Sequence, residues 1–435
     1  MKSLKKINYA LFISIFILNF IPTIYTTLRV YLIGNLPDAY AFSIAGELSW
    51  VSLIYEIFQE GIILPLFYFI GKAIDNKEQL NNKIRTGLLV TILIYLVISI
   101  IVIIFVKPML HLMATNKDII DSSATYIRLE SIANIFGVVY TFILVVFEVL
   151  KKTKYLYIIL LTKLILSIVF DLFLVSNLSF SLKLGINGIA VSNIISSIVL
   201  IFVSILLLYK ENIKIFEKTK LDFSWFKELG KKAGLSALES FVRNLFYMVM
   251  ILRMVNSVNE QGVYWVANNF IWGWLLLPVI SLGEVIKSDC GRNKEAIKEN
   301  SIGYLLFTLI IIIIWFLLIP TYKFFMKNVL QYSDVDKLFK LVMILIGFYA
   351  VYALQNVFDS IFYGIGKINY MIFETIIDNF IYYETAFILY KLNIWVPSLE
   401  NIALLFGFGM LFDGVVSTIA YLYLLKKEKI KLEVN

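Results

Sequence analysis

The sequence has little of what secreted domains and metal- or histidine-dependent enzymes rely on. Its 435 residues contain one cysteine, Cys290, and one histidine, His111. A single cysteine cannot form an intrachain disulfide or provide a thiol pair for a metal. The sequence shows no metal-ligand cluster and no nucleophile–base motif. A disulfide scaffold and a metal centre are therefore disfavoured. An intramembrane enzyme is only a weak hypothesis, because His111 falls in a predicted outer loop.

Charged residues are also few, at 16%, whereas 60% of the residues are hydrophobic and the mean hydropathy is +0.84. Soluble domains are about 45–50% apolar. The apolar residues here fall in blocks about as long as a bilayer-spanning helix, ~20 residues. We therefore predict an all-α integral membrane protein with twelve transmembrane helices. They lie at about 7–33, 42–70, 86–106, 122–148, 155–175, 185–209, 233–255, 262–286, 301–320, 341–363, 369–390 and 400–425.

The basic residues are distributed asymmetrically along this predicted topology. The formal net charge is +8, and with the amino terminus in the cytoplasm the inner segments hold 26 Lys and Arg residues against 8 in the outer segments. This bias is the positive-inside signature of membrane proteins. It favours a lipid bilayer over nucleic acid as the partner. It predicts a multi-pass protein of the cytoplasmic (inner) membrane with both termini in the cytoplasm.

Two halves of the sequence resemble each other at a nearly constant spacing. The matched positions are Lys107-Pro108 with Ile319-Pro320, Val139-Tyr140 with Val351-Tyr352, Lys154 with Lys367, Thr162 with Thr375, and Asp171 with Glu384. Six helices return the chain to its starting side, so the halves are parallel repeats related by a pseudo-two-fold axis along the membrane normal. We predict a six-helix lobe at 1–209, a basic cytoplasmic linker at 210–232 and a second lobe at 233–435. Such matched lobes are typical of transporters.

Two local features of this plan leave alternatives open. The linker is either a solvated connector or an amphipathic segment on the membrane surface, where Trp225 and Phe226 would contact lipid. Pro22, Pro65 and Pro278 fall inside predicted helices and predict kinks, which serve either gating or packing.

The predicted spans contain thirteen acidic residues, besides Glu400 at the very start of the last span, and five basic residues. Each charge costs roughly 2.5–3.5 kcal/mol at the centre of a membrane helix, so it must face a cavity or a partner. The excess of acids predicts a negative cavity that favours cations. Residues near the span ends are expected to reach water: Glu47, Glu148, Glu284 and Glu374. Those nearest mid-membrane are expected to function or pair: Glu56, Lys163, Arg243, Asp378 and Asp413.

A spacing of four residues places side chains on one helix face and groups several of these charges. The groups are Lys163, Ser167 and Asp171; Glu239 and Arg243; and Glu374 and Asp378. Glu239 and Arg243 predict an ion pair. Glu374 and Asp378 repel each other, which raises the proton affinity of one. They predict either a proton-carrying site or two acids that face a wet cleft.

Depth along the predicted helices places a polar cluster in the outer half of the first lobe. Its members are Arg29, Arg128, Glu130, Asp171 and Asn193, to which the stripe with Asp171 adds Ser167 and Lys163. Within it, Arg29 and Asp171 are the expected ion pair. On the eighth predicted helix, Trp265, Trp272 and Trp274 either line a central cleft or face lipid.

Taken together, the chain resembles the multidrug and toxic compound extrusion (MATE) family, within the wider superfamily that includes polysaccharide and lipid-linked sugar flippases. The resemblance covers residues 7–425. It rests on the twelve-helix plan, Gly34 after the first helix, Gly61 and Gly71 on the second, the basic turn at 147–154, the Gly185-Ile186-Asn187-Gly188-Ile189-Ala190 opening of the sixth, and Pro278 with Gly291 on the eighth.

The resemblance implies a first-lobe site with an acid on helix one, an Asn and an Asp on helix five, and a Thr on helix six. Asp171 matches the helix-five acid, Ser167 stands in the Asn position and Asn193 in the Thr position. Arg29 replaces the helix-one acid. Because arginine stays protonated, this departure argues against cation coupling in the first lobe. Coupling is then expected in the second lobe or the central cleft, through Glu239, Asp378 or Asp413; Asp359 lies about two turns from the family's usual acid position.

The leading hypothesis is a monomeric secondary active transporter, not an enzyme. It would export small amphipathic, often cationic, compounds and use no cofactor beyond a coupling Na⁺ or H⁺. The alternative is a flippase for a lipid-linked saccharide, in which Arg29, Arg128, Lys163, Arg243 and Arg253 would bind a diphosphate.

Overall fold

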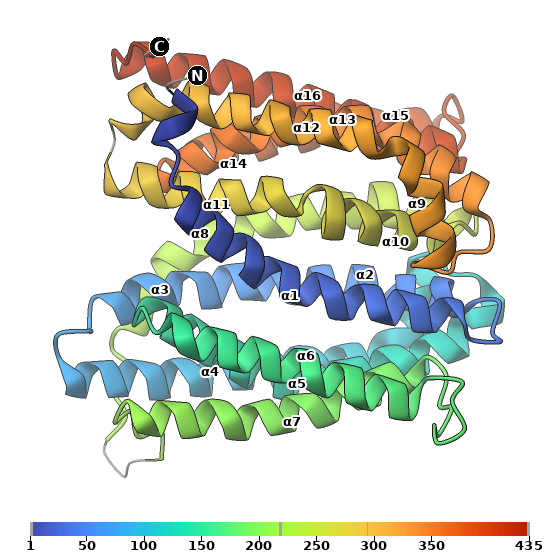
Figure 1. Ribbon diagram of the computed structural model, residues 1–435, viewed down its shortest axis with the longest axis horizontal. Coiled ribbons are helices and arrows are strands. Elements are labelled where there is room, and N and C mark those ends of the chain that lie inside the picture. The colour runs from blue at the N-terminus through green and yellow to red at the C-terminus, as the bar shows by residue number, and fades with distance from the viewer. Residues whose placement is uncertain (1–2, 217–219, 294, 433–435) are drawn as a thin grey trace. The chain divides into compact units, whose positions relative to one another are not determined.

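The chain is built of helices over the residues that the computed structural model describes, which are 3–216, 220–293 and 295–432 (Figure 1). Helices are expected from long apolar runs, because a membrane offers no water to satisfy backbone N–H and C=O groups. The helices are α1 (Tyr9–Gly34), α2 (Ala41–Phe58), α3 (Leu64–Gly71), α4 (Lys77–Leu112), α5 (Ile120–Val149), α6 (Thr153–Leu174), α7 (Asn187–Lys210), α8 (Phe226–Tyr247), α9 (Arg253–Ser257), α10 (Gln261–Phe270), α11 (Leu277–Arg292), α12 (Ala296–Asn328), α13 (Val335–Gly364), α14 (Ile368–Ile377), α15 (Glu384–Lys391) and α16 (Leu399–Lys427).

Four π-helical turns join some of these helices into longer segments. They are η2 (Gln59–Ile63), η4 (Met248–Leu252), η5 (Ile271–Leu275) and η6 (Asp378–Tyr383). Two 3₁₀ turns, η1 (Ser3–Lys6) and η3 (Lys117–Ile119), precede α1 and α5. With these joins, the described residues form twelve helical segments at the predicted positions, which confirms the all-α fold class.

Nine of the segments in the described residues are long and apolar enough to cross a membrane. A tenth qualifies if α10–η5 and α11, bent by 52° at their junction, count as one span. The chain is therefore a multi-pass membrane protein. Twelve as the number of spans, and the side on which the termini lie, stay predictions.

The helices form two compact units by their internal contacts. Unit 1 contains Met1–Tyr31 and Val263–Asn435, and unit 2 contains Leu32–Gly262. They differ from the predicted lobes in the assignment of α1 and of α8–α9. Helix α1 is bound within unit 1 by a hydrogen bond from Asn19 to Ser281 (3.2 Å) and one from Thr23 to the Gly273 carbonyl (3.2 Å).

Helix α8 is bound within unit 2 by close packing on η2. A Cβ on Gly61 would lie 2.7 Å from the Ala237 Cβ, so only glycine allows this approach. The predicted linker is also shorter than expected, because α8 begins at Phe226. Trp225 packs against Phe69 and donates to Thr86 Oγ1 at 3.2 Å, which anchors the end of the connector to α4. Most other described residues of the connector are exposed, so the choice between a solvated connector and a membrane-surface segment stays open. Part of that linker, 217–219, lies outside the described residues.

Two predicted helix ends are wrong. Helix α4 continues past Pro108 to Leu112, and α12 continues past Pro320 to Asn328. His111 therefore lies in the last turn of a helix and not in a loop. Near each proline an ion pair of 2.6 Å joins the helix to the next one. Lys107, directly before Pro108, contacts Asp121 in unit 2, and Lys323, just after Pro320, contacts Asp336 in unit 1.

The predicted kinks lie at specific joins. Pro65 and Pro278 stand in the first turns of α3 and α11, each directly after a π-helical turn. A missing N–H costs little there, because the first turn of a helix has unpaired N–H groups. Pro22 lies inside α1.

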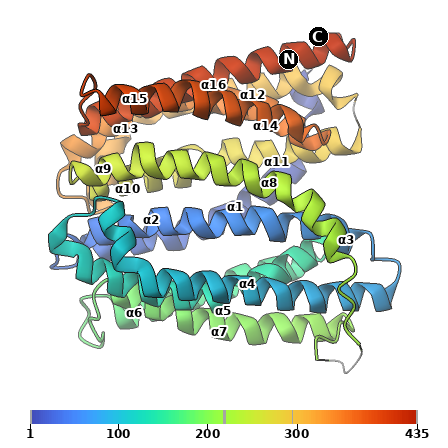
Figure 2. The same cartoon turned by 180° about the vertical axis from the view of Figure 1, so that it is seen from behind.

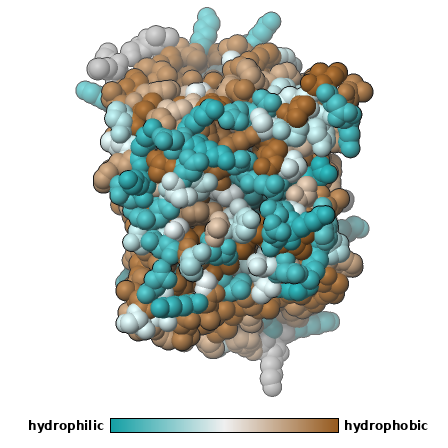
Figure 3. Space-filling model, turned by 90° about the vertical axis from the view of Figure 1, so that its right-hand side faces the viewer, coloured by the Kyte–Doolittle hydropathy of each residue, from teal (hydrophilic) through white to brown (hydrophobic). Residues whose placement is uncertain are grey.

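Each unit has its own core, and apolar side chains also cover its exterior. In unit 2, helices α4, α5 and α7 pack side by side around buried residues such as Ile84, Phe142 and Leu200 (Figure 2). In unit 1, α11, α13 and α16 enclose Ile286, Tyr304 and Phe362 among others. The N- and C-terminal segments lie at the same end of unit 1 (Figures 1 and 2). Hydrophilic residues gather at the opposite helix ends, with hydrophobic residues toward the sides (Figure 3).

Candidate functional site

Four carboxylates from three helical segments of unit 1 form an acidic cluster. Its members are Asp359 on α13, Glu374 on α14, Asp378 on η6 and Asp413 on α16. The side-chain amide of Gln355 joins two of them, donating to Asp413 Oδ2 at 2.6 Å and to Asp359 Oδ2 at 3.3 Å. Asp413 is close enough to both Glu374 and Asp378 to repel them. Glu374 and Asp378, grouped by spacing, therefore lie together with Asp413, singled out by depth, and with Asp359, named from the family resemblance.

Local features of the sequence explain why these helices approach so closely. A Cβ on Gly414 would lie 2.8 Å from Val351 Cγ1, so glycine allows α16 to approach α13 near Gln355. Ser417, one turn further along α16, donates to Asp359 Oδ1 at 2.8 Å. The helical register changes at Asp378, where η6 begins, and such π-turns are frequent at functional sites.

Three oxygen atoms of this cluster are buried without a hydrogen-bond partner. They are Glu374 Oε1, Asp378 Oδ1 and Gln355 Oε1. Leaving one buried acceptor unpaired costs about 1–3 kcal/mol, and more for a charged group. Lys287 on α11 is a base whose charge acts on Asp359, but its Nζ is held by Glu284 at 2.8 Å. The cluster is therefore suited to take up a proton or a cation.

The placement of Glu374 corrects the sequence analysis. Glu374 is only 2% exposed and does not reach water at a span end. The sequence analysis expected Glu374 to reach water because it lies close to the start of α14 at Ile368. Packing against α16 buries it.

A second charged group, the arginine cluster, lies in unit 2. Arg243 on α8 contacts Glu60 at 2.9 Å, Glu239 at 3.2 Å and Glu56 at 3.5 Å. The predicted Glu239–Arg243 contact is present, and Glu56 is beside it. The sequence analysis missed Glu60 as a partner, although its spacing of four from Glu56 could have indicated it. Three carboxylates around one guanidinium leave this region negative.

The predicted first-lobe polar cluster is present only in part. Asn193 on α7 donates to both carboxylate oxygens of Glu130 on α5, at 2.8 and 3.0 Å. Ser167 and Asp171 lie buried on α6, and Ser167 Oγ has no hydrogen-bond partner. Arg128 instead donates to the carbonyl oxygen of Ile103 at 3.2 Å.

Two other predicted members have aromatic neighbours. Lys163 lies 5.3 Å above the Tyr140 ring. Arg29 lies 5.7 Å from the Tyr25 ring. Arg29 belongs to unit 1 and Asp171 to unit 2, so their ion pair stays a prediction.

The tryptophans proposed for a cleft lie in unit 1. Trp272 Nε1 donates to the Tyr349 hydroxyl at 3.2 Å, and its side chain is well exposed. Trp274 Nε1 donates to Thr27 Oγ1 at 3.0 Å. Each of these two rings is held in place by a hydrogen bond, so its face could stack against a flat ligand. Their role in a cleft stays a prediction.

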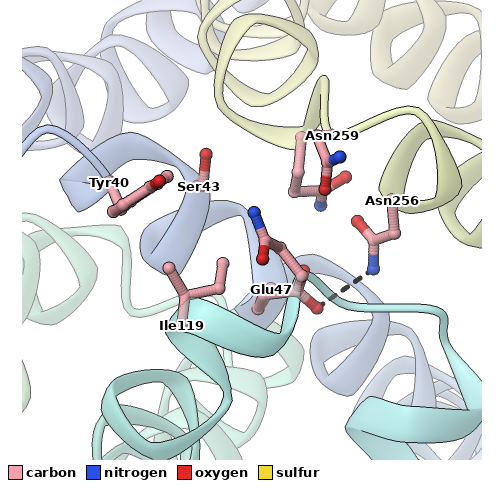
Figure 4. Close-up of a pocket in the computed structure, with 8 residues that line it drawn as sticks. Tyr40, Ser43, Glu47, Ile119, Asn256 and Asn259 are labelled. Atoms are coloured by element: carbon pink, nitrogen blue, oxygen red, sulfur yellow. Dashed lines mark hydrogen bonds between the residues drawn. The ribbon is translucent and has the colours of Figure 1, made fainter.

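A pocket with about 300 Å³ of space, open to solvent, is formed by residues of unit 2 (Figure 4). We call it the outer pocket, after the side that the predicted topology gives it. It is lined by Tyr40, Ser43, Glu47, Asn116, Ile119, Asn256, Asn259 and Gln261. Glu47, predicted to reach water, is 1% exposed. Its Oε2 accepts hydrogen bonds from Trp50 (3.0 Å), Thr115 (2.9 Å) and Asn256 (3.1 Å). These donors take the place of water around the carboxylate. Because Thr115 and Asn256 come from distant segments, the position of Glu47 along the sequence did not reveal its burial.

Among the described residues, no group of three or more His, Cys, Asp or Glu side chains is placed to hold a metal ion. Any site for an alkali cation would therefore need neutral oxygen ligands in addition to carboxylates.

Comparisons with known proteins agree with the fold. Residues 14–173 match the MatE family model, whereas no curated protein matches the sequence. An inward-facing multidrug resistance MATE transporter is similar with a TM-score of 0.74 and 15% identity, over 94% of both chains. A mutant of the Vibrio cholerae MATE transporter VcmN is similar with a TM-score of 0.70 and 16% identity, over 99% of both chains. An outward-facing multidrug resistance MATE transporter is similar with a TM-score of 0.66 and 16% identity, over 96% of this chain and 95% of the other. The predicted resemblance is confirmed.

Proposed function

We propose that this chain is a membrane transporter of the MATE family and exports small amphipathic, often cationic, organic compounds across the cytoplasmic membrane. Transport would proceed by alternating access in a monomer and be coupled to H⁺ or Na⁺. The observation that carries the proposal is the acidic cluster of Asp359, Glu374, Asp378 and Asp413, with Gln355 between two of them.

The coupling step follows from the electrostatics of that cluster. Four carboxylates gathered inside one bundle of helices cannot all be ionised at low energetic cost, because like charges repel and burial disfavours each charge. Uptake of a proton or a cation relieves the repulsion, and release restores it. A conformational change that alters access to the cluster would then link the ion gradient to substrate movement.

The arginine cluster supports a cationic substrate over a diphosphate. A flippase for a lipid-linked saccharide needs uncompensated basic groups, but Arg243 is surrounded by Glu56, Glu60 and Glu239. Arg253 Nε is bound to the Leu112 carbonyl oxygen at 3.0 Å. Negative clusters concentrate cations, and exposed Trp272 offers a ring face for a cation–π contact.

The test is transport in proteoliposomes that contain the purified full-length protein. Efflux of a panel of cationic dyes is measured under a Na⁺ gradient alone and under a H⁺ gradient alone. We expect one gradient to drive efflux. Asp378→Asn and Asp413→Asn should abolish the gradient-driven component while dye binding persists. Glu400→Gln, which changes a carboxylate of unit 1 outside the cluster, is the matched control.

Two results would count against this proposal. Undiminished gradient-driven efflux in an Asp378→Asn, Asp413→Asn double variant would exclude coupling through the cluster. Movement of a fluorescent lipid-linked saccharide, with no dye export under either gradient, would favour the flippase instead.

A further inference from the structure

We propose that the outer pocket of unit 2 is a binding site for a single Na⁺ ion. The ion's oxygen ligands would come from Glu47 on α2, Asn256 on α9 and Gln261 at the start of α10. This site shares no residue with the acidic cluster, and the proposal does not depend on the proposed coupling mechanism.

The orientation of Asn256 is fixed by its neighbours. Its Nδ2 donates to Glu47 Oε2 at 3.1 Å and to the Met113 carbonyl oxygen at 3.1 Å. Both partners accept hydrogen bonds and cannot donate, so a flipped amide would place oxygen against oxygen. Asn256 Oδ1 is therefore held on the opposite side, where it is buried without a donor. Figure 4 shows this oxygen turned toward the middle of the labelled residues.

The same argument holds for Gln261. Its Nε2 donates to the Gly46 carbonyl oxygen at 2.7 Å, which fixes the amide, and its Oε1 is buried without a partner. Both amide residues are 2% exposed. A Cβ on Gly46 would lie 2.7 Å from Gln261 Cγ, so the glycine makes room for this side chain. Two residues that line one pocket thus each have a buried amide oxygen without a hydrogen-bond partner.

The charge of the pocket identifies the class of ion. Glu47 is the only ionisable acid or base among the lining residues, apart from the phenol of Tyr40. A monovalent cation would neutralise its carboxylate, whereas a divalent cation would leave an excess positive charge. Carboxylate and amide oxygens are ligands for hard cations. The Ser43, Asn116 and Asn259 side chains and water complete the lining.

Occupancy would join three separate parts of unit 2. Glu47 comes from the first turns of α2, the neighbouring Thr115 and Asn116 from the connection between α4 and α5, and Asn256 and Gln261 from the two ends of the α9–α10 turn. An ion shared among these parts would hold the turn against α2. We therefore expect Na⁺ to stabilise the protein without any substrate present.

The experiment uses purified full-length protein and Na⁺ as the probe, with choline replacing Na⁺ at constant ionic strength. Direct ²²Na⁺ binding and the thermal unfolding midpoint are measured together. The wild-type midpoint should rise with Na⁺ and not with choline. Glu47→Gln should weaken Na⁺ binding about tenfold or more, which is about 1.4 kcal/mol or more. Ser43→Ala, a milder change in the lining, should weaken it by a smaller factor, which keeps the test valid if Glu47→Gln does not fold.

Asp413→Asn separates this proposal from the proposed function. It alters the acidic cluster and should leave the Na⁺ response of the outer pocket intact, as should the control Glu400→Gln. The proposal is overturned by a wild-type midpoint that is equal in Na⁺ and choline, or by Glu47→Gln and Ser43→Ala binding Na⁺ like the wild type. It is also overturned if Asp413→Asn alone removes the response, because the ion would then bind at the acidic cluster.

Discussion

At the scale of single residues, Arg243 is the most consequential charge in unit 2. Its guanidinium contacts three carboxylates from α2, η2 and its own helix. Removing one partner of a fully buried ion pair costs about 3–5 kcal/mol. The Arg243 side chain is 41% exposed, so the lower range for hydrogen bonds to charged groups, about 1.5–3 kcal/mol, is the better guide.

We therefore expect Arg243→Ala to destabilise the protein by about 1.5–3 kcal/mol, because Glu56, Glu60 and Glu239 would repel one another without it. Arg243→Lys keeps the charge but cannot reproduce the planar set of donors, so it should lose less. The unfolding midpoint of purified protein, compared at low and high salt, measures both effects. An Arg243→Ala midpoint equal to the wild type would show that the cluster contributes nothing to stability.

Sequence reasoning worked for some of these residues and failed for others for a definable reason. Spacing of four within one helix correctly predicted the Glu239–Arg243 contact, because that relationship is local. The burial of Glu47 could not be predicted, since its donors Thr115 and Asn256 come from distant segments. Polar amides such as Gln261 carry no charge signal, so the outer pocket was invisible in the sequence.

At the scale of elements, close helix packing in unit 1 depends on glycines that hydropathy does not reveal. Helix α16 crosses α13 where Gly407 faces Phe348, and a Cβ on Gly407 would overlap the Phe348 ring. Gly347, one residue away from Phe348 on α13, has nothing within 4 Å of its Cβ position. The two glycines therefore have different roles although both lie inside helices.

Gly407→Ala should cost about 1–3 kcal/mol, the usual penalty for overpacking, and lower the unfolding midpoint. Gly347→Ala is the matched control and should not destabilise, since alanine has a higher helix propensity than glycine. Equal midpoints for the two variants would mean that Phe348 moves aside freely. A Gly407→Ala, Phe348→Leu double variant should recover part of the loss, because a smaller side chain vacates the space.

Helix positions were predictable, whereas their ends and bends were only partly so. Each of the twelve predicted segments corresponds to a helical segment of the described residues, because apolar blocks of this length have few other stable structures in lipid. Pro108 and Pro320 misled the prediction of helix ends. Proline was taken as a terminator, yet the helices continue beyond it and are joined to the next helices by Lys107–Asp121 and Lys323–Asp336.

At the scale of the whole molecule, the repeat predicted lobes at 1–209 and 233–435, whereas internal contacts place α1 in unit 1 and α8–α9 in unit 2. The grouping of α1 with unit 1 depends on Asn19 and Thr23 meeting α11 and η5. The grouping of α8 with unit 2 depends on Gly61 and Arg243. These are pairwise contacts between distant segments, and a repeat in one sequence does not specify them.

The orientation of the whole molecule in the membrane is open to direct test, and the single cysteine makes the test simple. Cys290 is buried, so Cys290→Ala gives a cysteine-free background with little change in volume. The distribution of Lys and Arg predicts that the connection between α6 and α7 is outside and that the segment after α7 is cytoplasmic. Ser179→Cys and Lys214→Cys place one exposed thiol in each.

In intact cells, a membrane-impermeant maleimide should label Ser179→Cys and not Lys214→Cys. Lys214→Cys should become labelled only after the membrane is permeabilised, which also serves as the control that its thiol is reactive. The reverse pattern would place both termini outside and invert the inferred direction of transport. It would also move the outer pocket to the cytoplasmic side, because Tyr40, Asn116 and Asn259 lie in connections that share the predicted side of Ser179.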